Sequence, residues 1–359
     1  MDYSKGKKYR WGEKMQAAIM YGPDDIRVEE IPKPTCPSGG LILKVMAVGL
    51  CGSDIRNMGT DSRMGQYPHI FGHEIVGVVD EVDADVEIYA LGDRLYIYPE
   101  DHCLKCEPCR GGHSENCLHP GDYITRQGGF ADYVSVSKAQ LERDAVFKLP
   151  ADVSFESATL SEPLSSVFAC QENIGITLGD TVVIIGAGPI GCFHAQLAKL
   201  RGAQQVIMVE INDNRLEMTK QFGADFIINS IKEDPIQRIK EITKGKGADK
   251  VISANPSVKA QAQSIYMARQ GGIIVFFGGV PKGSLCELDT NYIHYNNLWI
   301  YGHFGANSLQ VQKAFELAIS EKFPAKKFIT HILPLKEIQQ GIDLSRNGTA
   351  IKVVLQPNL

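Results

Sequence analysis

The pattern of hydrophobic and polar positions changes about halfway along this chain. From Met15 to about Asp85, short β-rich runs are separated by Gly, Pro and Asp turns. These runs predict strands at Ala17–Met20, Ile26–Val28, Leu41–Val48 and Ile75–Val82. The first half of the chain is therefore expected to be mostly β-structure.

From about Asp180 onward, apolar strands alternate with helical patterns. The run Thr181–Ile185 is followed by a glycine turn and a helical pattern from Ile190 to Arg201. Further strands are predicted at Val206–Glu210, Phe226–Ile228, Lys250–Ser253 and Ile273–Phe277, with a helix at Arg215–Phe222. This alternation predicts a doubly wound parallel sheet covered on both faces, in a second domain that begins near Leu164. A helix over Ser308–Ser320 and a closing strand over Ala350–Leu355 could belong to either domain.

Length, composition and charge narrow the class of protein. The 359 residues suggest about two domains, and 44% hydrophobic with 22% charged residues is an ordinary globular composition. The net charge is −5, so neither a nucleic acid nor a membrane is expected as a partner. Residues 1–14 carry cations without an apolar stretch and are expected to be a solvated tail. Nine cysteines without an export signal indicate a reducing cytoplasm.

Four cysteines lie close together at positions 103, 106, 109 and 117. The spacing of Cys103, Cys106, Cys109 and Cys117 lets one short lobe, residues 100–120, bind a single tetrahedral Zn²⁺. Such a site has no open position for water or substrate, so its zinc would be structural. Two disulfides or a redox pair are the alternatives, but disulfides need an oxidising compartment.

The sequence Gly186-Ala-Gly188-Pro189-Ile190-Gly191 follows a predicted strand and begins a predicted helix. In that context it indicates a dinucleotide site, with the phosphates at the helix N-terminus. Glu210 ends the next strand, where its carboxylate can bind the adenosine ribose and repel a 2′-phosphate. NAD is therefore expected rather than NADP, and nearby Arg215 is the residue most able to reverse that preference.

A second group of metal-ligand residues is more scattered along the chain. Cys51-Gly-Ser53-Asp54 follows a strand, Gly72-His73-Glu74 precedes another, and Glu162 lies where the second domain begins. Thiolate, imidazole and carboxylate together suit Zn²⁺ and can leave one position open. Taken singly, each piece favours another explanation, because a lone Cys is usually a small buried apolar residue and a lone His–Glu pair is usually structural or on the surface.

Together with Gly128-Gly-Phe-Ala-Asp-Tyr133, these motifs resemble those of the zinc-dependent medium-chain dehydrogenase/reductase family over essentially all of Met15 to Leu359. The resemblance implies a GroES-like, mostly β catalytic domain with a structural-zinc lobe, and a Rossmann domain inserted in it. The expected limits are 1–163 and 303–359 for the catalytic domain and 164–302 for the Rossmann domain. Cys51, His73 and Glu74 would then be catalytic-zinc residues, with Glu162 as fourth ligand or as a partner through water. Ser53 would relay the substrate's proton.

Within the family, Glu162 resembles the polyol, sugar-alcohol-phosphate, threonine and butanediol dehydrogenases. Many relatives have a histidine where this chain has Arg56. This arginine could bind an anionic substrate group, replace the histidine on the proton path, or be an exposed charge with no specific role. Hydride transfer from a zinc alkoxide to NAD is the implied reaction, with two zinc ions per chain. The leading hypothesis is a polyol or sugar-alcohol-phosphate dehydrogenase that forms a homo-oligomer, either a tetramer or a dimer. A threonine- or butanediol-type enzyme and an inactive NAD-binding zinc protein are the alternatives.

Overall fold

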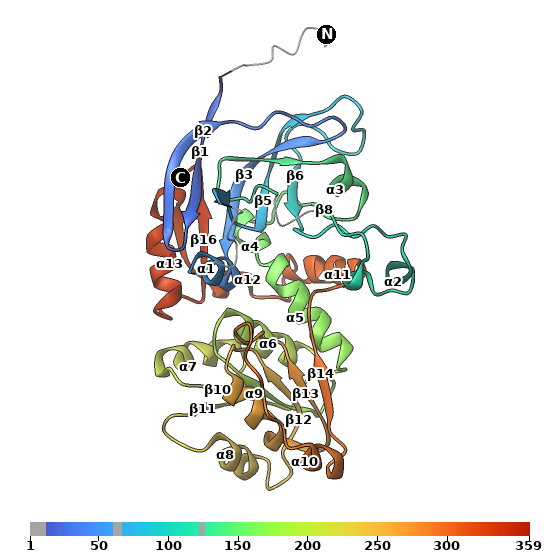
Figure 1. The fold of residues 1–359 in the computed structure, drawn as a ribbon, viewed down its shortest axis with the longest axis vertical. Coiled ribbons are helices and arrows are strands. Elements are labelled where there is room, and N and C mark those ends of the chain that lie inside the picture. Colours follow the sequence, from blue (N-terminus) through green and yellow to red (C-terminus); the bar gives the residue numbers. More distant parts are fainter. Residues whose placement is uncertain (1–11, 60–66, 122–125) are drawn as a thin grey trace.

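The computed structural model describes residues 12–59, 67–121 and 126–359 (Figure 1). Figure 1 shows a seven-stranded sheet in its upper part and a six-stranded sheet in its lower part, with helix α5 (Ser161–Asn173) between them. Most of the expected tail, residues 1–11, lies outside the described residues. Its last residue, Lys14, begins strand β1, so the expected tail is too long at its end.

The seven-stranded sheet takes strands from both ends of the chain. Its order is β15-β16-β3-β5-β6-β8, with β7 paired to β3. The bounds are β3 Leu41–Leu50, β5 Glu74–Val82, β6 Arg94–Ile97, β7 Tyr133–Val136, β8 Val146–Lys148, β15 Ile329–Pro334 and β16 Lys352–Gln356. The closing strand β16 begins two residues later than predicted. It pairs antiparallel with β3 (Val353 with Leu50), which joins the C-terminal segment to the first half of the chain.

A smaller sheet and several short helices surround these strands. The three-stranded sheet has the order β2-β1-β4, with β1 at Lys14–Gly22, β2 at Asp25–Pro32 and β4 at His69–Ile70. The helices are α1 Gly52–Met58, α2 Glu107–Arg110, α3 Lys138–Glu142, α4 Phe155–Ala158, α11 Ser308–Ala318, α12 Ala325–Phe328 and α13 Ile338–Arg346. Short 3₁₀ turns lie at Ser114–Asn116 and Leu335–Glu337. None of the helices within the described ranges combines the length and apolar character of a membrane span.

The six-stranded sheet is parallel at every pairing, as the alternation of strands and helices predicts. Its order is β11-β10-β9-β12-β13-β14. The bounds are β9 Thr181–Ile185, β10 Gln205–Glu210, β11 Phe226–Asn229, β12 Ala248–Ser253, β13 Ala268–Phe276 and β14 Trp299–Gly302. The helices are α6 Pro189–Leu200, α7 Asp213–Thr219, α8 Pro235–Ile242, α9 Val258–Ser264 and α10 Thr290–Tyr295, with 3₁₀ turns at Lys220–Phe222 and Ile265–Met267.

Alternation along β9 explains why this strand is apolar at every position after the first. Val182 and Ile184 pack into one hydrophobic core, while Val183 and Ile185 pack into another on the opposite face. Because successive strand residues point to opposite faces, a sheet covered on both sides needs apolar residues throughout. Each such side chain contributes about 1.5–3 kcal/mol when fully buried.

Helix α5 connects the two parts of the molecule through its side chains. Leu164 and Val167 pack into the core of the six-stranded sheet. Ala169, from the same helix, packs into a core around Tyr96 and Phe315 beside the seven-stranded sheet. The expected domain limit at 163/164 therefore falls inside a helix that serves both cores. That limit and the one at 302/303 stay predictions.

His194 on α6 is expected to make the protein sensitive to acid. It is fully buried, its Nδ1 faces the Gln171 amide at 3.2 Å, and burial, with a smaller effect of His303, lowers its pKa to about 3. Its stabilising contribution is therefore complete above pH 6.5 and is lost as the pH falls toward about 3. At pH 4 the loss should reach about 3 kcal/mol.

Thermal unfolding followed between pH 7 and pH 4 tests this expectation. Between pH 7 and pH 4, the melting temperature of the His194→Gln variant should fall less than that of the wild type. His294, which is exposed on α10, provides the matched control as His294→Gln. Equal pH sensitivity in the wild type and both variants would contradict the prediction.

Candidate active site

The four predicted cysteines of the lobe converge on one point. The sulfur atoms of Cys103, Cys106, Cys109 and Cys117 all lie within 4.8 Å of one another. Backbone N–H groups point at them: Lys105 and Cys106 donate to the Cys103 sulfur at 3.5 and 3.3 Å, and these bonds lower the pKa of Cys103 to about 6. Burial raises the pKa of Cys109 to about 12. Four converging sulfurs with amide donors fit a tetrahedral zinc.

A second cluster forms where two paired strands meet. Cys51 follows β3, His73 precedes β5, and Glu74 is the first residue of β5. The register pairs Gly49 with Glu74, which brings Cys51 beside His73. The ligand atoms of Cys51, His73 and Glu74 lie within 4.8 Å of one another. Gly49 makes room for this arrangement, because a Cβ there would lie 1.7 Å from Glu74 Oε2.

Asp54 orients His73, a role that the sequence analysis missed. Its Oδ1 lies 3.1 Å from His73 Nδ1, and its Oδ2 accepts the Cys51 N–H at 3.1 Å. The carboxylate is buried at the first turn of α1. Burial alone would lower the pKa of His73, but Asp54, Cys51 and Glu162 raise it well above its ordinary value. With Nδ1 held by Asp54, Nε2 is directed for ligation, as in carboxylate–histidine–metal sites.

Lys352 is the second residue that the sequence analysis missed. Its buried Nζ donates to Glu74 Oε1 at 2.5 Å and to the Leu50 carbonyl oxygen at 3.2 Å. Glu74 is fully buried, so this ammonium neutralises a carboxylate that water cannot reach. A lone lysine inside the apolar run of the closing strand is the signal in the sequence that could have identified it.

Glu162 lies opposite the cluster at the start of α5. Its Oε2 is 4.0 Å from His73 Nε2, so it is beyond hydrogen-bonding distance but close to the same space. Burial raises the pKa of Glu162 to about 7, partly offset by His73. The Glu74 oxygens are engaged by Lys352, whereas no such cation holds Glu162 among the described ion pairs.

A cavity of about 600 Å³ connects these groups. Its wall includes Ser53, Asp54, Asn57, His69, Phe71, His73, Glu100, Arg126, Gln127, Glu162 and Phe304. The Ser53 hydroxyl donates to the Cys51 sulfur at 3.3 Å. Arg56 lies on the exposed side of α1 and is not among the described residues that line the cavity. The arginine on the wall is Arg126, which donates to Asp101 Oδ1 at 2.7 Å.

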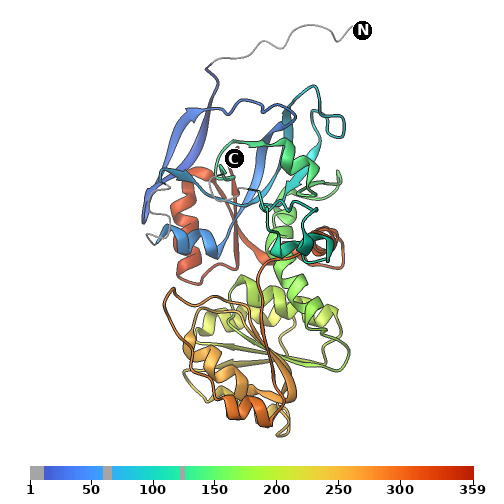
Figure 2. The ribbon, with the colours of Figure 1, turned by 45° about the vertical axis from the view of Figure 1, so that its right-hand side comes forward.

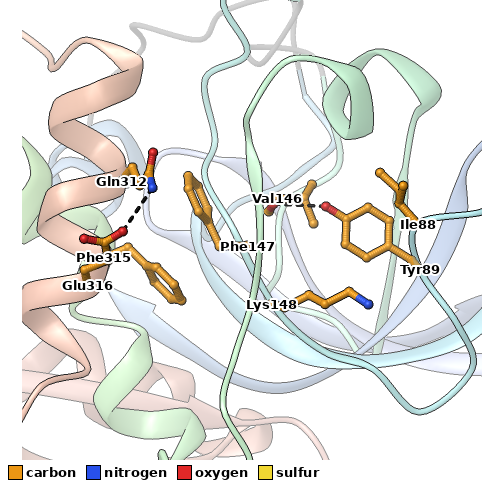
Figure 3. Close-up of a pocket in the computed structure, with 8 residues that line it drawn as sticks. All are labelled: Ile88, Tyr89, Val146, Phe147, Lys148, Gln312, Phe315 and Glu316. Atoms are coloured by element: carbon orange, nitrogen blue, oxygen red, sulfur yellow. Dashed lines mark hydrogen bonds between the residues drawn. The ribbon is translucent and has the colours of Figure 1, made fainter.

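A smaller hollow of about 320 Å³ lies elsewhere, beside α11 and the outer strand β8 (Figure 3). Among the described residues that line it, none belongs to either cysteine-containing cluster or to the glycine turn. The Tyr89 hydroxyl donates to the Val146 carbonyl oxygen at 3.0 Å and so covers part of the strand edge. This hollow is therefore separate from the candidate site.

The glycine turn follows β9 and precedes α6, as predicted. Gly186 has a φ of +109°, and a Cβ there would lie 2.7 Å from the Ala254 carbonyl oxygen. A Cβ at Gly191 would lie 1.9 Å from the Gly186 carbonyl oxygen, so this glycine allows the helix and strand to pack. A Cβ at Gly188 would meet nothing within 4 Å, which leaves the turn open at the N-terminus of α6. Pro189 and Ile190 form the first positions of that helix.

Glu210 and Arg215 lie near this turn with different partners. Glu210 ends β10, and its Oε2 accepts the Ala187 N–H at 2.8 Å, which places the carboxylate directly beside the glycine turn. Arg215 extends from α7 toward α13, where Nη2 lies 3.5 Å from the Ser345 carbonyl oxygen. Its guanidinium thus contacts the C-terminal segment.

Two domain profiles match the chain. The alcohol dehydrogenase GroES-like domain matches residues 37–151, and the zinc-binding dehydrogenase domain matches residues 189–320. Together they contain the glycine turn from Pro189 onward, the four-cysteine lobe and the Cys51–His73–Glu74 cluster.

Several known proteins are similar over nearly their whole length. Sorbitol dehydrogenase of Bacillus subtilis is 31% identical over 96% of this chain and 98% of its own. L-threonine 3-dehydrogenase of B. subtilis is 32% identical over 91% and 94% of the two chains. D-arabitol-phosphate dehydrogenase of Enterococcus avium is 32% identical over 94% and 95%.

Solved structures share the fold. A zinc-binding dehydrogenase from Sinorhizobium meliloti, solved with NADP, has a TM-score of 0.84 and 26% identity over 96% of this chain and 100% of its own. An alcohol dehydrogenase from Escherichia coli CFT073, solved with NADH, has a TM-score of 0.85 and 26% identity over the same shares. With its two large sheets, two cysteine-containing clusters and these relatives, the chain belongs to the zinc-dependent medium-chain dehydrogenase/reductase family of oxidoreductases.

Proposed function

We propose that this enzyme oxidises a secondary alcohol of a polyol or sugar-alcohol phosphate to the ketone, with NAD as acceptor and two zinc ions per chain. One observation carries the proposal: Ser53, His73 and Glu162 line a single cavity at the Cys51–His73–Glu74 cluster. That cavity, about 600 Å³, is large enough for a five- or six-carbon polyol phosphate. The polar groups on its wall can bind several hydroxyls.

The residues of this chain have separate roles in the proposed reaction. A bound zinc supplies a Lewis acid to the substrate oxygen, and a bound nicotinamide accepts the hydride. Cys51, His73 and Glu74 would hold the metal, with Glu162 as fourth ligand or as a partner through water. Asp54 fixes the ring of His73. Ser53 accepts the hydroxyl proton of the substrate at its Oγ and passes it outward.

The remaining predicted residues bind the structural metal and the cofactor. Cys103, Cys106, Cys109 and Cys117 hold the structural zinc, which keeps the lobe folded. The glycine turn binds the pyrophosphate at the N-terminus of α6. Closure of the two parts of the molecule around the cavity then aligns the carbinol carbon with the nicotinamide and excludes water.

A screen of NAD reduction tests the function. Free polyols, phosphorylated polyols, L-threonine and 2,3-butanediol are offered to the purified enzyme at equal concentration. We expect the highest kcat/KM with a polyol or its phosphate. A clear preference for L-threonine would replace this proposal with the second candidate, which the 32% identity to the B. subtilis threonine dehydrogenase supports.

Cofactor choice gives a prediction at Glu210. The Glu210→Ala variant should bind NAD about ten-fold more weakly, because it loses an acceptor for the ribose hydroxyls. It should also discriminate less against NADP, because a repulsive charge is removed. Kd values for both cofactors, measured by NADH and NADPH fluorescence, decide this. Arg215→Ala is the comparison variant. A wild-type enzyme that prefers NADP would contradict the proposal that Glu210 sets the preference for NAD.

We also propose a homo-oligomer in which a second copy covers strand β14. This strand is the outermost of the six-stranded sheet, and β13 is its only paired neighbour among the described strands. Trp299 on it is 71% exposed and Ile300 is 38% exposed. The free edge of such a strand offers backbone N–H and C=O groups, and here also exposed apolar side chains, to a second chain.

The Trp299→Glu variant should therefore shift the protein toward monomers. Light scattering coupled to size-exclusion chromatography measures this directly. Ile231→Glu replaces an exposed apolar residue that follows β11, at the other edge of the sheet, and should leave the mass unchanged. A wild-type protein that elutes as a monomer would contradict the proposal.

The reducing cytoplasm remains our proposal for its location. All nine cysteines lie within the described residues, and none of them forms a disulfide there. Clusters of free thiols that bind zinc persist in reducing compartments.

A further inference from the structure

The four-cysteine lobe contacts the segment that connects the two parts of the molecule. This junction segment, residues 302–308, runs from the end of β14 to the start of α11. Figures 1 and 2 both show the lobe, marked by α2 in Figure 1, beside α11. The contact therefore links the lobe to a part of the chain about 190 residues away.

Direct hydrogen bonds form this contact. Ser308 N–H donates to Ser114 Oγ at 2.8 Å, and the two hydroxyl oxygens are 3.2 Å apart. His102 Nδ1 lies 3.3 Å from the same Ser308 hydroxyl. The Asn307 amide donates to the Gly112 carbonyl oxygen at 3.0 Å. Ser114 and His102 are each 4% exposed, so water has little access to their side of these bonds, whereas the Asn307–Gly112 bond is exposed.

Ser114 supplies an acceptor that α11 lacks. The first amides of a helix have no partner within the helix. Asn307 caps the amide of Gln310, while Ser308 N–H, one position into the helix, is satisfied by Ser114 from the lobe. The lobe thus completes the N-terminus of α11. Loss of Ser114 Oγ would take this partner away from a part-buried amide.

The junction segment does not fix its own conformation. Gly302 and Gly305 flank His303 and Phe304, and Gly305 has a φ of +74°. Glycine permits many backbone conformations, so contacts from elsewhere must select one. The His303 N–H donates to the Phe276 carbonyl oxygen at 3.1 Å and fixes the upstream end. At the downstream end, Ala306 is buried in the core around Tyr96 and Phe315, and the lobe holds Asn307 and Ser308.

Phe304 lies between these two attachments and lines the catalytic cavity. Its side chain is 78% exposed, so packing around the ring does not hold it in place. The position of this wall therefore depends on the backbone that carries it.

We propose that the lobe, through Ser114, holds the junction segment and thereby positions Phe304 as a wall of the substrate cavity. Ser114 is a positioning residue, because it acts through Ser308 and Phe304 and touches no reacting atom. This inference rests on the proposed function only in taking the cavity as the substrate site. Substrate binding should depend on Ser114, whereas the chemical step should not.

The test compares Ser114→Ala, Phe304→Ala and the double variant with the best alcohol from the screen. Ser114→Ala should raise the KM for the alcohol about three- to thirty-fold, the effect of one lost part-buried hydrogen bond, with kcat and the KM for NAD unchanged. In the Phe304→Ala background the same change should have no further effect on KM. Zinc content should stay at the wild-type value. His113→Ala, at an exposed lobe residue, is the control and should behave as wild type.

Hydrogen exchange gives a readout that does not require turnover. Ser114→Ala should speed exchange of the amides of residues 303–308, with Ser308 most affected. If Ser114→Ala destabilises the lobe, Asn307→Ser serves as the test variant instead. A serine at position 307 still caps α11 but cannot reach the Gly112 carbonyl oxygen. Unchanged hydrogen exchange in the junction segment would overturn the inference. The inference would also fail if Ser114→Ala raised the KM equally in the wild type and in the Phe304→Ala variant. Failure to oxidise any alcohol overturns the proposed function instead, while the exchange experiment still decides the role of Ser114.

Discussion

Treatment with a chelator is expected to abolish turnover before it unfolds the lobe. The Cys51–His73–Glu74 cluster faces a cavity of about 600 Å³, whereas the four lobe sulfurs surround one another. A coordinatively open site exchanges its metal more readily than a closed one. Before treatment, two zinc ions per chain should be found. Activity should be lost when the first of them is removed.

Single variants separate the two metal sites. Cys51→Ser should retain one zinc, lose essentially all activity and keep a melting temperature close to that of the wild type. Cys106→Ser should lose the other zinc and destabilise residues 100–120, which hydrogen exchange can locate. One zinc or fewer in carefully purified wild-type protein, by elemental analysis, would contradict the two-site assignment.

Replacement of Lys352 should produce the largest loss of stability. Lys352→Met leaves the fully buried Glu74 carboxylate without its cation, and breaking one side of a buried ion pair costs about 3–5 kcal/mol. Urea unfolding of the metal-free protein measures this free energy.

A matched double variant separates this charge effect from simple loss of packing. When Glu74→Leu is combined with Lys352→Met, no charge remains buried, so most of the stability should return. An equal loss in the single and double variants would show that Lys352 stabilises the sheet by packing alone.

Local patterns in the sequence were sufficient for much of the fold. The apolar run of β9 and the glycine turn after it depend on neighbours only a few residues apart. Cys103 to Cys117 likewise span fifteen residues, so their spacing alone brings the sulfurs together. Where an element was predicted, the errors are shifts at its ends, such as the late start of β16. Several short strands were not predicted at all, among them β6, β7, β8, β14 and β15.

Pairings between distant strands could not be predicted in this way. Asp54 lies inside a recognised motif, but its partner His73 is set by the register of β3 and β5. Arg56 is close to Cys51 in sequence, yet the turn of α1 directs Asp54 and Asn57 to the cavity and leaves Arg56 on the exposed side. Its predicted role in substrate binding or proton transfer stays a prediction.

The ion pair of Glu74 with Lys352 also constrains how the enzyme is made in the cell. During synthesis, Glu74 leaves the ribosome 278 residues before the cation that neutralises it. Until β16 pairs with β3, the early strands cannot bury that carboxylate at low cost, and Cys51 and His73 lack their final surroundings. The nascent chain therefore carries an unfinished metal site through most of its synthesis, and the site is completed only after the last strand has emerged.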